Sequence, residues 1–128
     1  MAKTFADMVA EGRTVAPPIS IDDAKAQLAA HPETVVVDVR QEGDAKGDGI
    51  PGSVNIPLGL LAIRADTKLP EQYRDGRLQD RSVPVITTCG PGGQAALAAK
   101  TLHAMGFTNV RVLDGGTVAW KAAGNAVE

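Results

Sequence analysis

The fold of this chain is most constrained by two short runs rich in β-branched residues, at 35–39 (VVVDV) and 84–88 (PVITT). Runs without alternating polar residues predict strands that are buried on both faces, which is the situation in parallel sheets. Patterns typical of helices lie around and between these runs, so the covering layers are present as well. We therefore predict an α/β protein with an open parallel sheet and helices on both faces.

The other elements follow from capping residues and from residues that break regular structure. Thr4 predicts a short helix to about Val9 that ends at Gly12, and Ser20 predicts a second helix that stops at His31-Pro32. Between them, Pro17-Pro18 breaks the chain, because proline cannot donate a backbone hydrogen bond. The remaining predictions are a loop at 41–52, a very short strand at 53–56, a helical turn at 58–63, a polar connector at 70–81, a helix at 94–105, a strand at 109–113 and a last helix around 118–120.

Length and composition exclude several classes of protein. A chain of 128 residues is sized for one domain. Its net charge of −2 gives no field that would hold nucleic acid or an anionic membrane surface. No run approaches the ~18 apolar residues of a membrane span. The single cysteine cannot form an internal disulfide, which suits a reducing compartment, and we expect the cytoplasm.

That cysteine, Cys89, follows the second buried strand and begins the sequence Cys-Gly-Pro-Gly-Gly before a helix. Open parallel sheets place their sites at the carboxyl ends of the strands. The reactive form of cysteine is the thiolate, which a helix N-terminus and a curled loop of backbone amides both favour. Gly90, Gly92 and Gly93 allow such a curl because they accept positive φ, whereas Pro91 stiffens the loop and removes one amide donor. The plain alternative is a small apolar residue at a strand end.

The same residues permit a rival interpretation as a dinucleotide-binding fingerprint. Gly90, Gly92 and Ala95 follow a strand and open a helix, and Asp114 ends the next strand. Only 14 residues follow Asp114, however, so the later strands of a nucleotide-binding half-domain are missing. A turn-forming acid is the preferred interpretation of Asp114. No cluster of His, Cys and Asp has metal-ligand spacing, so neither a metal nor another cofactor is expected.

In order and spacing, several motifs resemble those of single-domain rhodaneses, from about Ile19 to Gly124. They are Asp38-Val39-Arg40, the segment 50–58 (IPGSVNIPL), the loop from Cys89 to Ala95, the segment 106–110 (GFTNV), Leu113-Asp114-Gly115-Gly116 and Ala119-Trp120. The resemblance implies a rhodanese-like sheet of about five strands in one domain at 19–125, preceded by an N-terminal helix and proline-rich connector at 1–18.

The resemblance also implies a sulfurtransferase. Cys89 would take a sulfane sulfur from a donor such as thiosulfate, become a persulfide, and pass the sulfur to a thiol, to cyanide or to a sulfur-relay protein. The loop of Gly90, Pro91, Gly92, Gly93, Gln94 and Ala95 would bind the substrate, and its amides (Pro91 excepted) would stabilise the charge on the terminal sulfur.

This sequence departs from the family's pattern at the loop, where Gln94 replaces a frequent arginine and Ala95 a frequent serine. The site therefore lacks a fixed cation for an anionic donor. Asp38, Arg40 and Arg64 are candidate supporting residues: Asp38 as an acceptor for loop amides, Arg40 in an ion pair at the strand end, and Arg64 as a replacement cation. The alternative function is a persulfide carrier or regulatory binding module without turnover. A cysteine phosphatase is disfavoured, because the position of its phosphate-binding arginine is occupied by Ala95.

Overall fold

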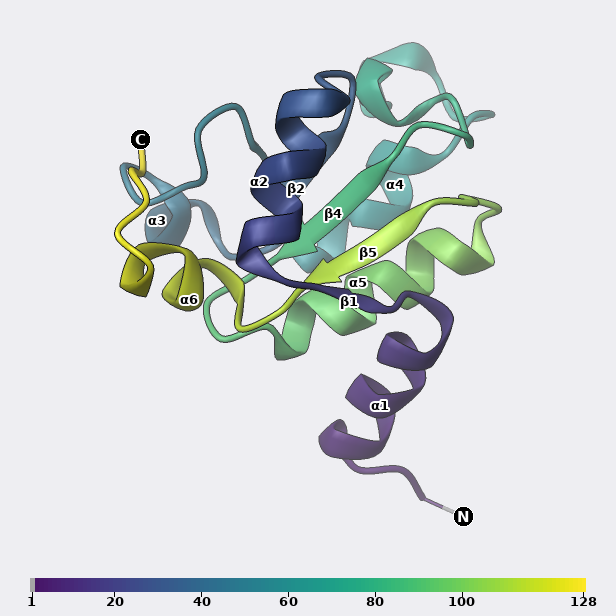
Figure 1. Cartoon of the computed structure of the whole chain (residues 1–128). Helices are drawn as coiled ribbons and strands as arrows, with labels where there is room; N and C mark the ends of the chain where they lie inside the picture. The colour runs from purple at the N-terminus through teal and green to yellow at the C-terminus, as the bar shows by residue number, and fades with distance from the viewer. Residues whose placement is uncertain (1) are drawn as a thin grey trace.

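The computed structural model describes residues 2–128 and has a single parallel sheet at its centre (Figure 1). The order of the strands is β1-β5-β4-β2-β3, and every neighbouring pair is parallel. This confirms the predicted α/β fold with a sheet of five strands. The strands are β1 (Pro18–Ile19), β2 (Val35–Asp38), β3 (Val54–Asn55), β4 (Val85–Thr88) and β5 (Val110–Leu113).

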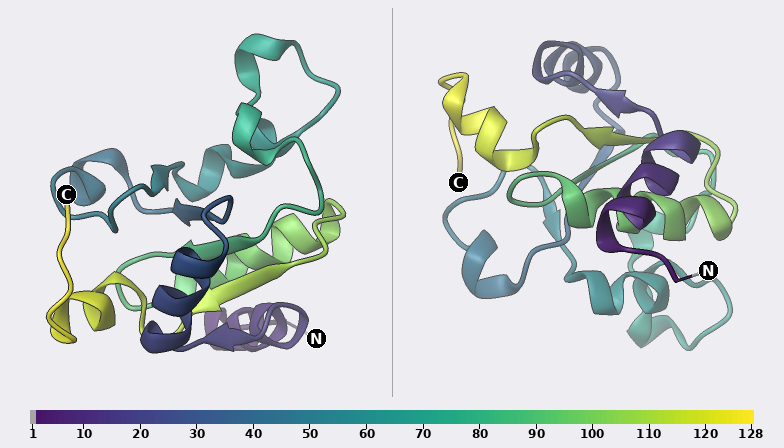
Figure 2. Two further views of the ribbon diagram at one scale, coloured as in Figure 1. Left: turned by 45° about the horizontal axis from the view of Figure 1, so that its top comes forward. Right: turned by 90° about the horizontal axis from the view of Figure 1, so that it is seen from below.

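Helices cover both faces of this sheet (Figure 2). The helices are α1 (Phe5–Val15), α2 (Ile21–Ala30), α3 (Glu42–Ala45), α4 (Leu61–Ala65), α5 (Gly93–Ala104) and α6 (Gly116–Ala122), with short 3₁₀ turns at Leu58–Leu60, Glu71–Tyr73 and Gly76–Leu78. One core cluster includes buried residues of α4 and α5 and has Val9 of α1 packed against it. The other contains Ala24 of α2 and Trp120 of α6. No helix within residues 2–128 is both long and apolar enough to cross a bilayer.

The two long buried runs became the central strands. Val37 of β2 and Val85 of β4 are fully buried, as expected for strands covered on both faces. Asp38 is paired in register with Thr88, so both strands end at the same edge of the sheet. Cys89 follows immediately at that edge.

Helix α1 differs from its prediction, because it continues through Gly12 to Val15. Gly12 is buried, and a Cβ on it would lie 2.2 Å from the backbone oxygen of Ala96 in α5. The residue that was expected to end the helix therefore allows two helices to approach closely. Whether residues 1–18 can be separated from the domain stays a prediction, although β1 already pairs with β5 at Pro18.

Gly12→Ala is expected to destabilise the protein by about 1–3 kcal/mol, because the added methyl group must force α1 away from α5. The matched control is Gly43→Ala in α3, where a Cβ would meet nothing within 4 Å. Denaturant unfolding of both variants measures the difference. A Gly12→Ala variant as stable as Gly43→Ala would show that the contact between α1 and α5 is not closely packed.

Candidate active site

Cys89 lies at the carboxyl edge of the sheet between β4 and α5. Its side chain is almost completely buried, with 2% exposed. The backbone N–H of Gly92 donates a hydrogen bond to the Cys89 Sγ over 3.0 Å. This amide comes from the residue that caps α5, so the sulfur lies next to the positive end of a helix. The amide and the helix end are therefore placed to stabilise negative charge that develops beside the sulfur during a reaction.

The glycines of the loop serve different purposes. Gly92 has φ of +111°, which favours glycine, and the predicted curl depends on it. Gly90 and Gly93 do not have positive φ, so for them the prediction is wrong. At Gly93 the reason is space, because a Cβ would lie 2.8 Å from the Cζ of Phe5. At Gly90 a Cβ would meet nothing within 4 Å, and nothing in the structure requires glycine there.

The start of α6 holds the carbonyl side of the loop. The N–H of Thr117 donates to the Cys89 carbonyl over 2.9 Å, and the N–H of Val118 donates to the Gly90 carbonyl over 3.1 Å. The hydroxyls of Thr88 and Thr117, both buried, lie 3.0 Å apart and share a hydrogen bond. We call these contacts the α6 clamp.

Gly116 allows the α6 clamp to form. It has φ of +62°, and a Cβ on it would lie 2.3 Å from the Gly90 carbonyl oxygen and 2.8 Å from that of Cys89. The sequence analysis named Gly115-Gly116 only as part of a motif that resembles rhodaneses, and it missed this contact. The signal was the second glycine, since one glycine is sufficient for most turns.

Arg40 forms an ion pair at the end of β2, the role that the sequence predicted for it, and its partner there is Asp38. Arg40 Nη2 donates to Asp38 Oδ2 over 2.7 Å, and the Arg40 backbone N–H donates to Asp38 Oδ1 over 3.1 Å. Arg40 Nη1 donates to Asp48 over 2.8 Å, and Lys121 of α6 donates to the same carboxylate. Hydrogen bonding to Asp38, and then to Asp48, raises the pKa of Arg40 above its ordinary value. Arg40 is therefore committed to holding β2, its loop and α6 together.

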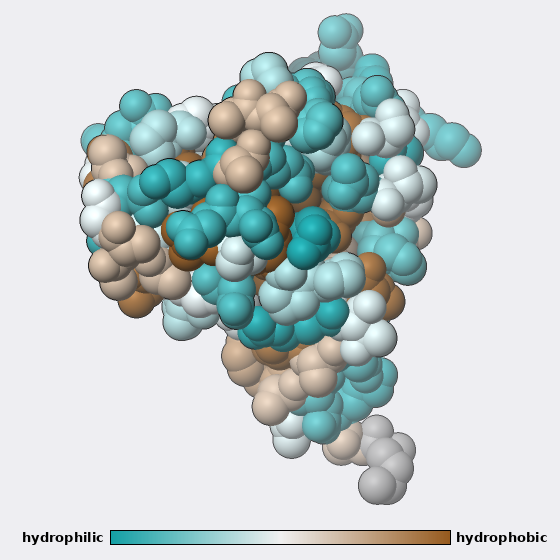
Figure 3. Space-filling view, in the orientation of Figure 1, coloured by the Kyte–Doolittle hydropathy of each residue, from teal (hydrophilic) through white to brown (hydrophobic). Residues whose placement is uncertain are grey.

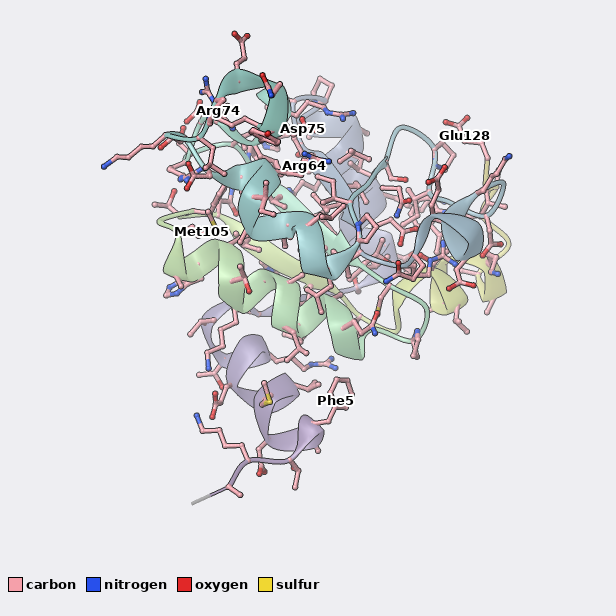
Figure 4. The ribbon with its side chains drawn as sticks, turned by 180° about the vertical axis from the view of Figure 1, so that it is seen from behind. Phe5, Arg64, Arg74, Asp75, Met105 and Glu128 are labelled. Atoms are coloured by element: carbon pink, nitrogen blue, oxygen red, sulfur yellow. The ribbon has the colours of Figure 1, made fainter. Side chains whose placement is uncertain are left out.

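Arg64 lies in a pocket of about 620 Å³. The residues that line it include Asp38, Glu42, Lys46, Asn55, Arg64 and Glu128. Arg64 Nη1 donates to the Tyr73 carbonyl over 2.9 Å, and Arg64 and Glu128 are labelled in Figure 4. The pocket thus brings Asp38 and Arg64 together, but neither Cys89 nor its loop is among the lining residues.

The other loop residues divide into exposed and buried ones. Pro91 and Gln94 are exposed, whereas Ala95 is buried and its carbonyl accepts a hydrogen bond from Thr87 Oγ1 over 2.8 Å. The outer surface of the loop is therefore neutral. Within residues 2–128 no group of three His, Cys, Asp or Glu side chains could hold a metal ion. The chemistry that these residues support is nucleophilic attack by Cys89, with backbone amides to stabilise charge on sulfur.

Comparisons with known proteins agree with this chemistry. A family model described as Rhodanese-like domain matches residues 20–123. A probable 3-mercaptopyruvate sulfurtransferase of Schizosaccharomyces pombe is 38% identical over 71 residues, which are 51% of this chain and 24% of that protein. A mitochondrial thiosulfate sulfurtransferase of Saccharomyces cerevisiae is 29% identical over 88% of this chain and 78% of its own length. The chain spans about a quarter or less of the first three curated relatives that it matches.

Solved structures give the same fold. The human single-domain sulfurtransferase has a TM-score of 0.74 at 22% identity, covering 84% of this chain and 96% of its own. A Rhodopseudomonas palustris protein of unknown function, described as "Possible Tyrosine Phosphatase", has a TM-score of 0.89 at 30% identity, covering 100% of this chain and 96% of its own. The second match includes α1, since it covers the whole chain.

Proposed function

This chain belongs to the rhodanese-like domain family, and from that membership we propose that it is a sulfurtransferase in which Cys89 carries the sulfur as a persulfide. The observation that carries the proposal is the hydrogen bond from the Gly92 N–H to the Cys89 Sγ at the N-terminus of α5. An amide that already donates to the thiol sulfur is placed to stabilise negative charge beside it.

In the first step, the Cys89 thiolate attacks the outer sulfur of a donor such as thiosulfate. A bond forms between the Cys89 Sγ and that sulfur, while the bond from the outer sulfur to the sulfonate sulfur breaks. The electron pair of the broken bond leaves with sulfite. The persulfide that remains on Cys89 carries one negative charge, which the loop amides and the helix N-terminus stabilise.

In the second step, a thiolate or cyanide attacks the terminal sulfur of the persulfide. The bond between that sulfur and the Cys89 Sγ breaks, and its electron pair restores the Cys89 thiolate. The products are an acceptor persulfide or thiocyanate. A sulfur-relay protein is a further proposed acceptor, because related chains occur in proteins named as adenylyltransferase and sulfurtransferase. We also propose a reducing compartment such as the cytoplasm, where the single thiol stays free.

The proposed function is tested by steady-state transfer of sulfur from thiosulfate to cyanide, followed as thiocyanate formation. We expect turnover above the protein-free rate. If Cys89 takes up one sulfur but thiocyanate does not accumulate, the chain is instead a persulfide carrier or a regulatory module.

The description of the Rhodopseudomonas relative makes phosphatase activity the second candidate to test. A cysteine phosphatase of this loop design uses an arginine where this chain has the buried Ala95, which has no group to bind phosphate. We therefore expect no hydrolysis of p-nitrophenyl phosphate above background, and burst release of p-nitrophenol would favour the phosphatase instead.

Thiosulfate is expected to be a weak donor, and Gln94→Arg is expected to improve it. The loop offers a neutral amide at Gln94, and the nearby strand-end cation Arg40 is already bonded to two carboxylates. A charge-assisted contact contributes about 1.5–3 kcal/mol, and Gln94 is exposed, so we expect the lower end, about tenfold in kcat/KM. The gain should shrink as salt is added, because an exposed charge is screened.

The matched control is Gln94→Met, which keeps the length of the side chain but adds no charge. Steady-state kinetics of the three proteins at low and high ionic strength make the comparison. An unchanged or lower kcat/KM for Gln94→Arg would mean that a cation at position 94 does not contact the donor.

A further inference from the structure

Helix α1 lies outside the residues that the family model matches, yet it contacts the Cys89 loop. Its first residue is Phe5, whose side chain points towards the start of α5 (Figure 4). A Cβ on Gly93 would lie 2.8 Å from the Cζ and 3.0 Å from the Cε2 of Phe5. The edge of the ring therefore occupies the space that a side chain at position 93 would take.

Helix α1 is held against the domain mainly by contacts in its C-terminal half. Gly12 brings α1 into close contact with Ala96, and Glu11 pairs with Lys100 of α5. Lys100, and then Lys3, lower the pKa of Glu11 to about 2 by hydrogen bonding to its carboxylate. Arg13 donates to Asp114 over 2.8 Å at the end of β5. These contacts lie at residues 11–13, and nearer to Phe5 the side chain of Val9 packs against the core.

The loop needs support on this side, because three of its residues are glycines. Glycine has the greatest backbone freedom of any residue, and the amides of the loop act on sulfur only if they keep their direction. The α6 clamp holds the carbonyls of Cys89 and Gly90. It makes no contact of this kind at Gly93, the point where Phe5 packs.

We propose that Phe5 is a positioning residue for sulfur transfer, whose ring braces Gly93 and thereby keeps the Gly92 amide on the sulfur of Cys89. The proposal rests on the proposed function and deepens it, because it makes α1 part of the reacting site. The Phe5 side chain adds little to the core, since 57% of the residue is exposed. Figure 3 likewise shows apolar surface in the region of α1. The contribution of Phe5 is thus directed to the loop.

The test compares Phe5→Ala with Met8→Ala. Met8 lies on the same helix and is 41% exposed, but it lines a separate groove with Leu97 and Lys100. We expect Phe5→Ala to slow single-turnover persulfide formation from saturating thiosulfate by about tenfold. We also expect faster amide hydrogen exchange at Gly92 and Gly93, measured by NMR. Met8→Ala should leave both quantities unchanged.

Two further variants separate bracing from a general effect on folding. Phe5→Leu should keep most of the rate of persulfide formation, because it keeps an apolar group against Gly93. Gly93→Ala should displace the ring and slow the reaction. Once Phe5 is alanine, however, the nearest side-chain atom to the new Cβ is that of Val9, at 3.8 Å. The Phe5→Ala, Gly93→Ala double variant should therefore be no slower than Phe5→Ala alone.

Equal persulfide rates and equal loop exchange in Phe5→Ala and the unmodified protein would overturn the proposal. An equal loss of the persulfide-formation rate in Met8→Ala and Phe5→Ala would also overturn it. If Phe5→Ala does not fold, the other two single variants decide the question. The proposal expects a slower persulfide formation in Gly93→Ala than in Phe5→Leu, and equal rates in the two would overturn it. If the unmodified protein forms no persulfide at all, the proposed function fails, while the exchange measurement still tests whether Phe5 holds the loop.

Discussion

Cys89→Ser is expected to reduce sulfur transfer to the protein-free background while the fold remains intact. The chain contains a single cysteine, so no second thiol can accept the sulfur. Serine is close to cysteine in size, and its hydroxyl can accept the hydrogen bond that the Gly92 N–H now donates to sulfur. The reaction is lost because an alkoxide does not form at neutral pH without a base, and a serine cannot become a persulfide.

The measurement is thiocyanate formation together with thermal unfolding. We expect the melting temperature of Cys89→Ser to stay within a few degrees of that of the unmodified protein, for a stability change below about 1.5 kcal/mol. Cys89→Ala provides the second control, because it removes the polar atom altogether. Thiocyanate formation above background in either folded variant contradicts a Cys89 persulfide.

Gly116→Ala is expected to impair both stability and activity, although residue 116 carries no reactive group. The new methyl group would have to fit 2.3 Å from the Gly90 carbonyl oxygen at a φ of +62°. Positive φ at a non-glycine residue costs about 1–3 kcal/mol. Displacing the loop adds an overpacking cost of about 1–3 kcal/mol. We expect a total loss of about 2–6 kcal/mol. We also expect a fall in kcat/KM of more than about tenfold as the α6 clamp loosens.

Gly124→Ala is the matched control for this variant. It has φ of +86°, but a Cβ there would meet nothing within 4 Å. Gly124→Ala therefore bears the cost of positive φ alone, and its kcat/KM should stay unchanged. Denaturant unfolding and steady-state kinetics of the two variants isolate the contribution of the α6 clamp. Equal kinetics for the two would mean that the clamp does not position the Cys89 loop.

The fold could be predicted where burial on both faces leaves a continuous pattern in the sequence. Runs 35–39 and 84–88 became β2 and β4, and their common edge placed Cys89. Strand β1 could not be predicted, because Pro17-Pro18 indicated only a break in the chain. Pro18 cannot donate, but its carbonyl accepts a hydrogen bond from Arg111 at 2.7 Å, which suits an edge strand.

The site was predictable only where its contacts are local in sequence. Arg40 follows the end of a buried strand, so an ion pair at that end could be expected, and its partner is Asp38, two residues earlier. The contact of Phe5 with Gly93 and that of Gly116 with Gly90 join segments that only the folded sheet brings together. The sequence offered Arg64 as a replacement cation for the loop. It could not tell that the Arg64 guanidinium donates to the Tyr73 carbonyl in a pocket that the loop does not line.

The central claim is that Cys89 accepts a sulfane sulfur, and the most direct measurement is intact mass spectrometry after incubation with thiosulfate. The unmodified protein should gain the mass of one sulfur atom, and cyanide should remove it. Cys89→Ser, treated in the same way, should gain nothing. The account is contradicted if the unmodified protein gains no sulfur from thiosulfate and also none from an organic thiosulfonate. It is equally contradicted if Cys89→Ser gains the mass of one sulfur atom.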